Sequence, residues 1–111
     1  MGKNILVQRR GRGYFIFRAP THRRIHPTGY NSADGHGSGM VRDLVHEAAR
    51  GAPLARLAMD GGREMYLVAP EGLAVGQRIH IGSDAPTETG NIKPLGKIPE
   101  GTMICNVENR P

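Results

Sequence analysis

A run of arginines between Gln8 and His26 is the part of this sequence with the clearest chemistry. It holds six arginines and two histidines, and no acidic residue interrupts it. Guanidinium groups form paired hydrogen bonds with phosphate oxygens, so such a density of arginine suits a polyanion. A segment of this kind repels itself and has too little apolar surface to fold alone. We therefore expect an arm that binds a polyanion and that a folded body holds in place.

The charge of the chain is divided unevenly between its two ends. Residues 1–38 carry seven Lys and Arg against one acid, whereas residues 39–111 carry eight against nine. A basic arm on a near-neutral body is typical of nucleic-acid-binding proteins. Because the arm is rich in arginine and also carries aromatic residues, the pattern favours structured RNA over a solvated tail. We expect an arm over 1–38 and a body over 39–111.

The expected RNA contacts lie mainly in the arm, where glycines beside the arginines let the backbone approach a phosphate chain. Tyr14, Phe15 and Phe17 have two possible roles, since aromatic rings can stack on bases or anchor the arm to the body. In the body, three arginines either extend the basic surface or are solvated charges. The expected RNA-binding residues are Lys3, Arg9, Arg10, Arg12, Tyr14, Phe17, Arg18, His22, Arg23, Arg24, His26, Arg50, Arg56 and Arg63.

The two histidines of the arm raise the question of a metal site. His22 and His26 are four residues apart, a spacing that could hold a metal on a helix. Pro20 and Pro27 flank them and favour an extended chain, and no third ligand is near. We expect no metal, and polar contacts to RNA or solvent for both histidines.

The body reads as a series of short strands separated by turns. The chain has 16 glycines and 8 prolines, and its hydrophobic fraction is 38%. Apolar alternation predicts strands at 40–47, 54–59, 64–69, 78–81 and 102–107, with Cys105 buried in the last one. Ile92, Leu95 and Ile98 are expected to cover the open end of the sheet. This predicts an all-β fold, a small five-stranded OB-type barrel preceded by the extended basic arm.

Several classes of function are excluded by what the sequence lacks. No apolar run approaches the roughly 20 residues that span a bilayer, and the N-terminus has no signal-peptide core, so we expect a cytoplasmic protein without a membrane partner. No nucleophile–base pair or cofactor loop is visible, and strand parity separates Asp43 from His46 unless a bulge intervenes. We expect no enzyme, no catalytic residue, no cofactor and no small-molecule substrate. The single cysteine excludes an internal disulfide.

A second RNA-binding hypothesis is a free-standing OB module that binds single-stranded RNA, such as an RNA chaperone. That class needs aromatic residues on the binding strands. Only Tyr66 qualifies, which counts against it.

An ordered set of motifs resembles the second universal protein of the large ribosomal subunit in its archaeal and eukaryotic form. The motifs cover nearly the whole chain, and they are Gln8–Gly13, Phe17–Pro20, His22-Arg23, Asp43, His46, Ala52-Pro53, Leu67–Gly72, Val75-Gly76, Gly90-Asn91, Pro94-Leu95, Ile98–Gly101 and Asn106–Glu108.

The resemblance implies a basic arm and an OB-type barrel that both bind large-subunit ribosomal RNA, with neighbouring ribosomal proteins as possible partners. In that family a second, SH3-like barrel and a basic extension follow. We expect this sequence to stop near the end of the first barrel, so the role of the second half is not transferred. Residues 28–39 depart from the family pattern.

Overall fold

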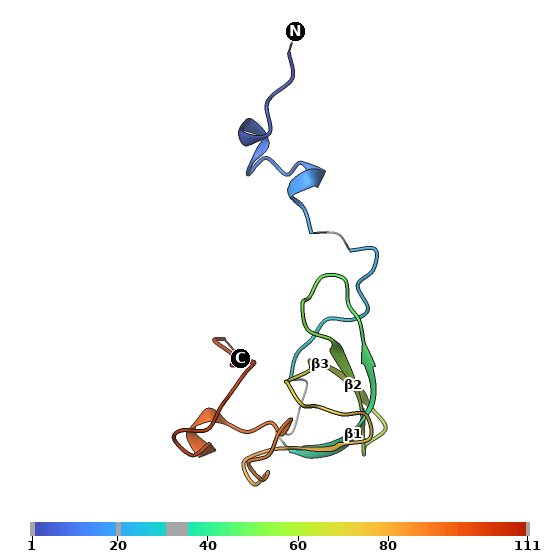
Figure 1. Ribbon diagram of the computed structural model, residues 1–111, viewed down its shortest axis with the longest axis vertical. Helices are drawn as coiled ribbons and strands as arrows, with labels where there is room; N and C mark the ends of the chain where they lie inside the picture. Colours follow the sequence, from blue (N-terminus) through green and yellow to red (C-terminus); the bar gives the residue numbers. More distant parts are fainter. Residues whose placement is uncertain (1, 20, 31–35, 111) are drawn as a thin grey trace.

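Four antiparallel strands form the sheet of this protein (Figure 1). The computed structural model describes residues 2–19, 21–30 and 36–110. The strands are β1 (Gly37–Val45), β2 (Leu54–Met59), β3 (Glu64–Val68) and β4 (Arg78–Ile81), in the spatial order β3-β2-β1-β4. The helical pieces of these residues are three short 3-10 turns, η1 (Val7–Arg9), η2 (Phe15–Phe17) and η3 (Leu95–Lys97). The predicted all-β class is confirmed.

The strand register puts the apolar positions of neighbouring strands on one face. Val41 lies opposite Leu57, and Ala55 lies opposite Leu67. With Ile79 and Ile81 of β4, these side chains form the buried core. The faces predicted for β2, β3 and β4 are therefore confirmed.

The close pairing of β1 and β2 depends on a glycine. A Cβ atom at Gly39 would lie only 2.8 Å from the carbonyl oxygen of Ala58 and from the sulfur of Met59. A larger residue would push the two strands apart, so the glycine lets β1 join the sheet.

The C-terminal part of the chain differs from the prediction. Residues 102–107 form no strand, and Cys105 is exposed instead of buried, so both predictions are wrong. Asn106 has a φ of +54°, a left-handed conformation that turns the chain out of the strand pleat. The segment touches the sheet through the Asn106 side chain, which donates a hydrogen bond to the carbonyl oxygen of Val68 at 3.0 Å. The described sheet is consequently open.

Smaller differences affect the ends of elements. The strand predicted at 40–47 begins at Gly37 and ends at Val45. Ile92 packs on the core and forms a parallel bridge with Ile81, as expected of a residue that covers the sheet. Leu95 is exposed, so it does not share that role.

The arm extends away from the sheet as a chain of turns (Figure 1). The molecule measures 65 Å along its longest axis against 30 and 26 Å along the others. Phe15 is 85% exposed and Phe17 is 42% exposed, so neither anchors the arm to the body. Pro20, expected to keep the arm extended, and positions 31–35 of the expected loop at 28–39 lie outside the described residues.

Candidate nucleic-acid interface

The arginines of the arm project into solvent from a series of tight turns. Arg10, Arg12, Arg18, Arg23 and Arg24 are exposed, and Arg9 is partly buried. Among residues 2–19, 21–30 and 36–110, every ion pair uses an arginine of the body and none uses an arginine of the arm. The guanidinium groups at these positions are therefore available to an external anion.

Two glycines shape the backbone of this arginine cluster. Gly11 and Gly13 have φ angles of +72° and +75°, the left-handed region that favours glycine. The turn that contains Gly11 is held by the N–H of Arg12, which donates to the carbonyl oxygen of Arg9 at 3.4 Å. The glycines therefore allow tight turns within the arginine cluster, whose members Arg10 and Arg12 are exposed.

Arg9 is the arginine of the arm with the most internal contacts. Its Nε donates to the carbonyl oxygen of Asn4 at 2.8 Å, and its guanidinium carbon lies 5.8 Å from the centre of the Tyr14 ring. A cation over an aromatic face is attracted by the negative charge of that face. Arg9 and Tyr14 therefore place a positive charge and an aromatic ring side by side on the arm. Lys3, Tyr14, Phe17 and His22 are also exposed.

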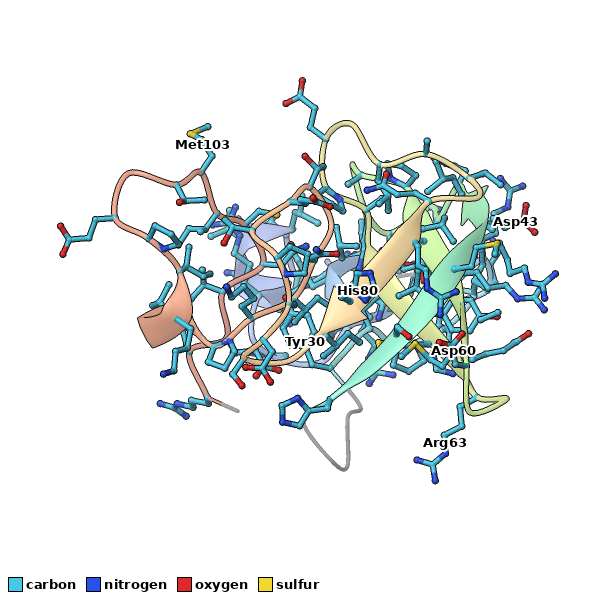
Figure 2. The ribbon with its side chains drawn as sticks, turned by 90° about the horizontal axis from the view of Figure 1, so that it is seen from below. Tyr30, Asp43, Asp60, Arg63, His80 and Met103 are labelled. Carbon is cyan, nitrogen blue, oxygen red and sulfur yellow. The ribbon has the colours of Figure 1, made fainter. Side chains whose placement is uncertain are left out.

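The three body arginines predicted to extend the basic surface have different surroundings. Arg50 pairs with Glu47. Arg56 pairs with Glu64, whose Oε1 also accepts a hydrogen bond from Arg56 Nε at 3.1 Å. This hydrogen bond is the main reason that the pKa of Glu64 is lowered and that of Arg56 is raised. Arg63 projects from the β2–β3 turn (Figure 2) and has no ion pair in the described part of the chain.

Arg42 is a basic residue of the same surface that the sequence reading missed. It is exposed on β1 and, with Asp43, Arg56, Arg63 and Glu64, lines a shallow hollow of about 530 Å³ on the outer face of the sheet. Its positive charge is one of the lesser causes of the lowered pKa of Glu64. Arg42 falls at the register shift between Val41 and Asp43, where alternation breaks down, so the strand pattern gave no signal for its exposure.

His26 stacks on a strand residue of the body. Its ring and that of Tyr66 on β3 have centroids 4.4 Å apart and planes inclined by 15°. Each ring therefore covers one face of the other. The one strand aromatic that could have served as a base-stacking platform is occupied on that side by the arm itself.

Two other features bear on ligands and membranes. In the described ranges, no three His, Cys, Asp or Glu side chains gather as a metal site would require. The same ranges contain no helix with the length and apolar character that crossing a bilayer demands.

Comparison with known proteins gives one consistent family. Residues 6–81 match the family model described as Ribosomal Proteins L2, RNA binding N-terminal domain. The chain is 48% identical over 117 residues to large ribosomal subunit protein uL2 of Thermofilum pendens, with 100% of the chain and 47% of the relative covered. It is 52% identical over 110 residues to the protein of that name from Pyrobaculum calidifontis, covering 99% and 45%.

A third relative, uL2 of Korarchaeum cryptofilum, is 44% identical over 113 residues, covering 100% of the chain and 46% of the relative. The chain thus spans just under half the length of these relatives. The matches extend over the arginine-rich arm and the whole sheet, and they confirm the resemblance that the ordered motifs indicated. This chain therefore belongs to the ribosomal protein L2 family, whose RNA-binding N-terminal domain it contains.

Proposed function

We propose that this chain is a structural constituent of the large ribosomal subunit that binds and stabilises large-subunit ribosomal RNA. The observation that carries the proposal is the contrast in arginine pairing. Arg50, Arg56 and Arg78 of the body face carboxylates, whereas no arginine of the arm does so among the described residues. Unpaired guanidinium groups on an extended arm are what a phosphate backbone requires.

The mechanism is neutralisation of phosphates along the arm. If all six arm arginines contact phosphates, the logarithm of the affinity falls with the logarithm of the salt concentration with a slope of about −4 to −5. Phosphate contacts position the protein but carry no sequence information. Selectivity comes from the match between the RNA shape and the path of the arm, because folded RNA is recognised largely by shape.

The proposed contacts divide between the arm and one corner of the body. We assign RNA contact to Lys3, to the six arm arginines, to Tyr14, Phe17 and His22, and to Arg63 with the neighbouring Arg42. Arg50, Arg56 and His26 already have partners within the protein, and this supports a role in holding the fold. The protein acts without catalysis or cofactor, on the cytoplasmic ribosome, beside other ribosomal proteins.

We also propose a division into an arm over 1–38 and a body over 39–111 that completes an OB-type five-stranded barrel in the assembled state. The strand order β3-β2-β1-β4 leaves β3 and β4 at the two ends of the sheet. Residues 102–107 lie beside the end of β3, where Asn106 bonds to Val68. Pairing of this segment with β3 on one side and with β4 on the other would close the sheet.

The alternative, a free-standing module for single-stranded RNA, receives less support. Such modules stack bases on exposed strand aromatics. Tyr66 is the strand residue that would do so, and His26 covers one face of its ring. Weak binding to poly-U beside tight binding to folded ribosomal RNA would separate the two functions.

Crosslinking in a cell extract tests the proposal directly. A tagged chain is added to an extract of Sulfolobus acidocaldarius, an organism whose uL2 is 44% identical to this chain, and is crosslinked with ultraviolet light. We expect large-subunit ribosomal RNA as the main attached species and crosslinked peptides from the arm. Recovery mainly of messenger or transfer RNA would overturn the ribosomal assignment.

A further inference from the structure

Glu47 is a buried carboxylate in a place where the core does not need one. It lies two residues after the end of β1 and is 0% exposed, the sole charged residue of the described chain that is fully buried. A charge removed from water is unfavourable unless nearby groups pair with it and donate hydrogen bonds to it. The partners of Glu47 therefore indicate why a carboxylate stands here.

One partner is the backbone at the base of the arm. The N–H of Ile25 donates to Glu47 Oε1 at 3.2 Å, across 22 residues of sequence. The other partner is Arg50, whose guanidinium pairs with Glu47 Oε2. Oε1 thus accepts a hydrogen bond from the base of the arm, while Oε2 faces the Arg50 guanidinium as an ion pair and accepts no hydrogen bond among the described residues.

Arg50 extends this contact to a second point on the arm. Its Nη2 donates to Thr28 Oγ1 at 3.3 Å, while its own backbone N–H donates to the carbonyl oxygen of Glu47 at 3.2 Å. Between the two attachment points, His26 stacks on Tyr66. The base of the arm, residues 25–28, is therefore held on the body from two sides.

We propose that Glu47 and Arg50 are positioning residues that form a latch, fixing the direction in which the arm leaves the body. This inference rests on the proposed ribosomal RNA-binding function and names the part of the body that serves it. The latch does not touch RNA. It limits the directions open to residues 3–24, so a larger fraction of free molecules holds the arginines where the RNA can receive them. Apparent affinity rises in proportion to that fraction.

The first experiment measures the latch without RNA. Spin labels are placed at two exposed positions, Thr21→Cys in the arm and Glu71→Cys in the body, in a Cys105→Ser background, and electron–electron distances are recorded. We expect a narrow distribution in the native sequence and a broad one in Glu47→Gln. Asp60→Asn is the matched control, because it removes one negative charge from the exposed pair with Arg78. An unchanged distribution in Glu47→Gln would overturn the latch.

The second experiment measures its effect on binding. The probe is large-subunit ribosomal RNA of Pyrobaculum calidifontis transcribed in vitro. If Glu47→Gln lowers the fraction of free molecules with a correctly directed arm to one fifth of its native value, the variant binds the RNA about fivefold more weakly. The salt slope is unchanged, because the arm keeps its charges. Asp60→Asn gains the same net charge and should bind at least as tightly as the native sequence. Equal affinities of Glu47→Gln and the native sequence would overturn the positioning role.

A second variant guards against simple misfolding. Arg50→Lys keeps the positive charge beside Glu47. Lysine lacks the planar guanidinium fork, however, so it cannot contact Glu47 and Thr28 at the same time. We expect a smaller broadening and a smaller loss of affinity, with the urea midpoint of the body close to native. If the native chain itself fails to bind the RNA while the distances respond as expected, the proposed function fails and the latch remains.

Discussion

The arm and the body use the same residue types in opposite ways. In the body, Arg50, Arg56 and Arg78 pair with carboxylates, and Leu57 and Ile79 are buried. In the arm, arginines have no such partners among the described residues, and large apolar side chains such as those of Ile5, Val7 and Phe15 are exposed. The sheet of the body pairs three of its arginines and buries one apolar face, while Arg42 and Arg63 have no ion pair among the described residues. The arm leaves charge and apolar surface for another molecule to satisfy.

The largest effect should come from the charges of the arm. Replacing Arg9, Arg10, Arg12, Arg18, Arg23 and Arg24 together with glutamine should lower affinity for large-subunit ribosomal RNA by about a thousandfold at low salt, because the electrostatic contribution depends on these charges. Binding titrations at several salt concentrations should show a slope of only about −2 to −3, the contribution of the remaining Lys3, Arg42 and Arg63. Urea unfolding of the body should be unchanged.

The matched control for this variant replaces the same six residues with lysine. The charge is retained, so the salt slope should persist, while affinity falls only modestly through loss of the planar guanidinium fork. A sextuple glutamine variant that still bound with a steep salt slope would contradict the division of roles between arm and body.

The next effect concerns the apolar residues. Leu57 is 0% exposed in the centre of the core, so Leu57→Ala should lower the free energy of unfolding by about 2–5 kcal/mol through lost burial and the cavity left behind. Phe15→Ala in the arm removes a larger side chain that is 85% exposed and should leave unfolding nearly unchanged. Urea denaturation measures both. Similar losses from the two substitutions would mean that the arm packs on the body.

The smallest effect lies where arm and body meet. Tyr30 donates a hydrogen bond to the carbonyl oxygen of Asn106 at 2.5 Å, and its pKa is raised above 10.0, first by burial and then by Cys105 and Glu108. Folding therefore favours the protonated phenol. This contribution is complete below pH 10 and is lost as the pH rises through the higher pKa of the folded state.

Tyr30→Phe tests this contact. The variant should lose about 0.5 kcal/mol at neutral pH, the low end for a hydrogen bond at a partly exposed site. Thermal melts across pH 9 to 11 should show that the difference from the native sequence narrows as the pH rises. Tyr14→Phe in the arm is the control and should not alter unfolding. A difference that stays constant through this range would contradict the role of the phenol.

Local patterns predicted most of the body. The strands at 54–59 and 78–81 agree with β2 and β4 because alternation and Gly-rich turns fix both their faces and their ends. The family could also be recognised, because its motifs and their order are read directly from the sequence. The segment at 102–107 also alternates, but whether an edge segment pairs depends on distant partners, and the left-handed Asn106 interrupts it.

The partners of charged side chains were harder to predict. Arg56 and Glu64 are eight residues apart and meet only because the β2–β3 hairpin brings Ala58 opposite Glu64 and Arg56 opposite Tyr66. Glu47 lies just past the end of a strand, where alternation no longer indicates which way a side chain points. Sequence could therefore identify the arginines of the arm as a group, but it could not separate Arg63 from the paired Arg50 and Arg56.

The outer edge of β3 has a consequence for the chain when no partner covers it. Among the described residues only Val68, at its end, receives a hydrogen bond there, from Asn106. An uncovered strand edge can template a second copy through backbone hydrogen bonds. Newly made molecules stored at high concentration would then add edge to edge and precipitate. Under the proposed function, early binding to ribosomal RNA would protect the chain from such association.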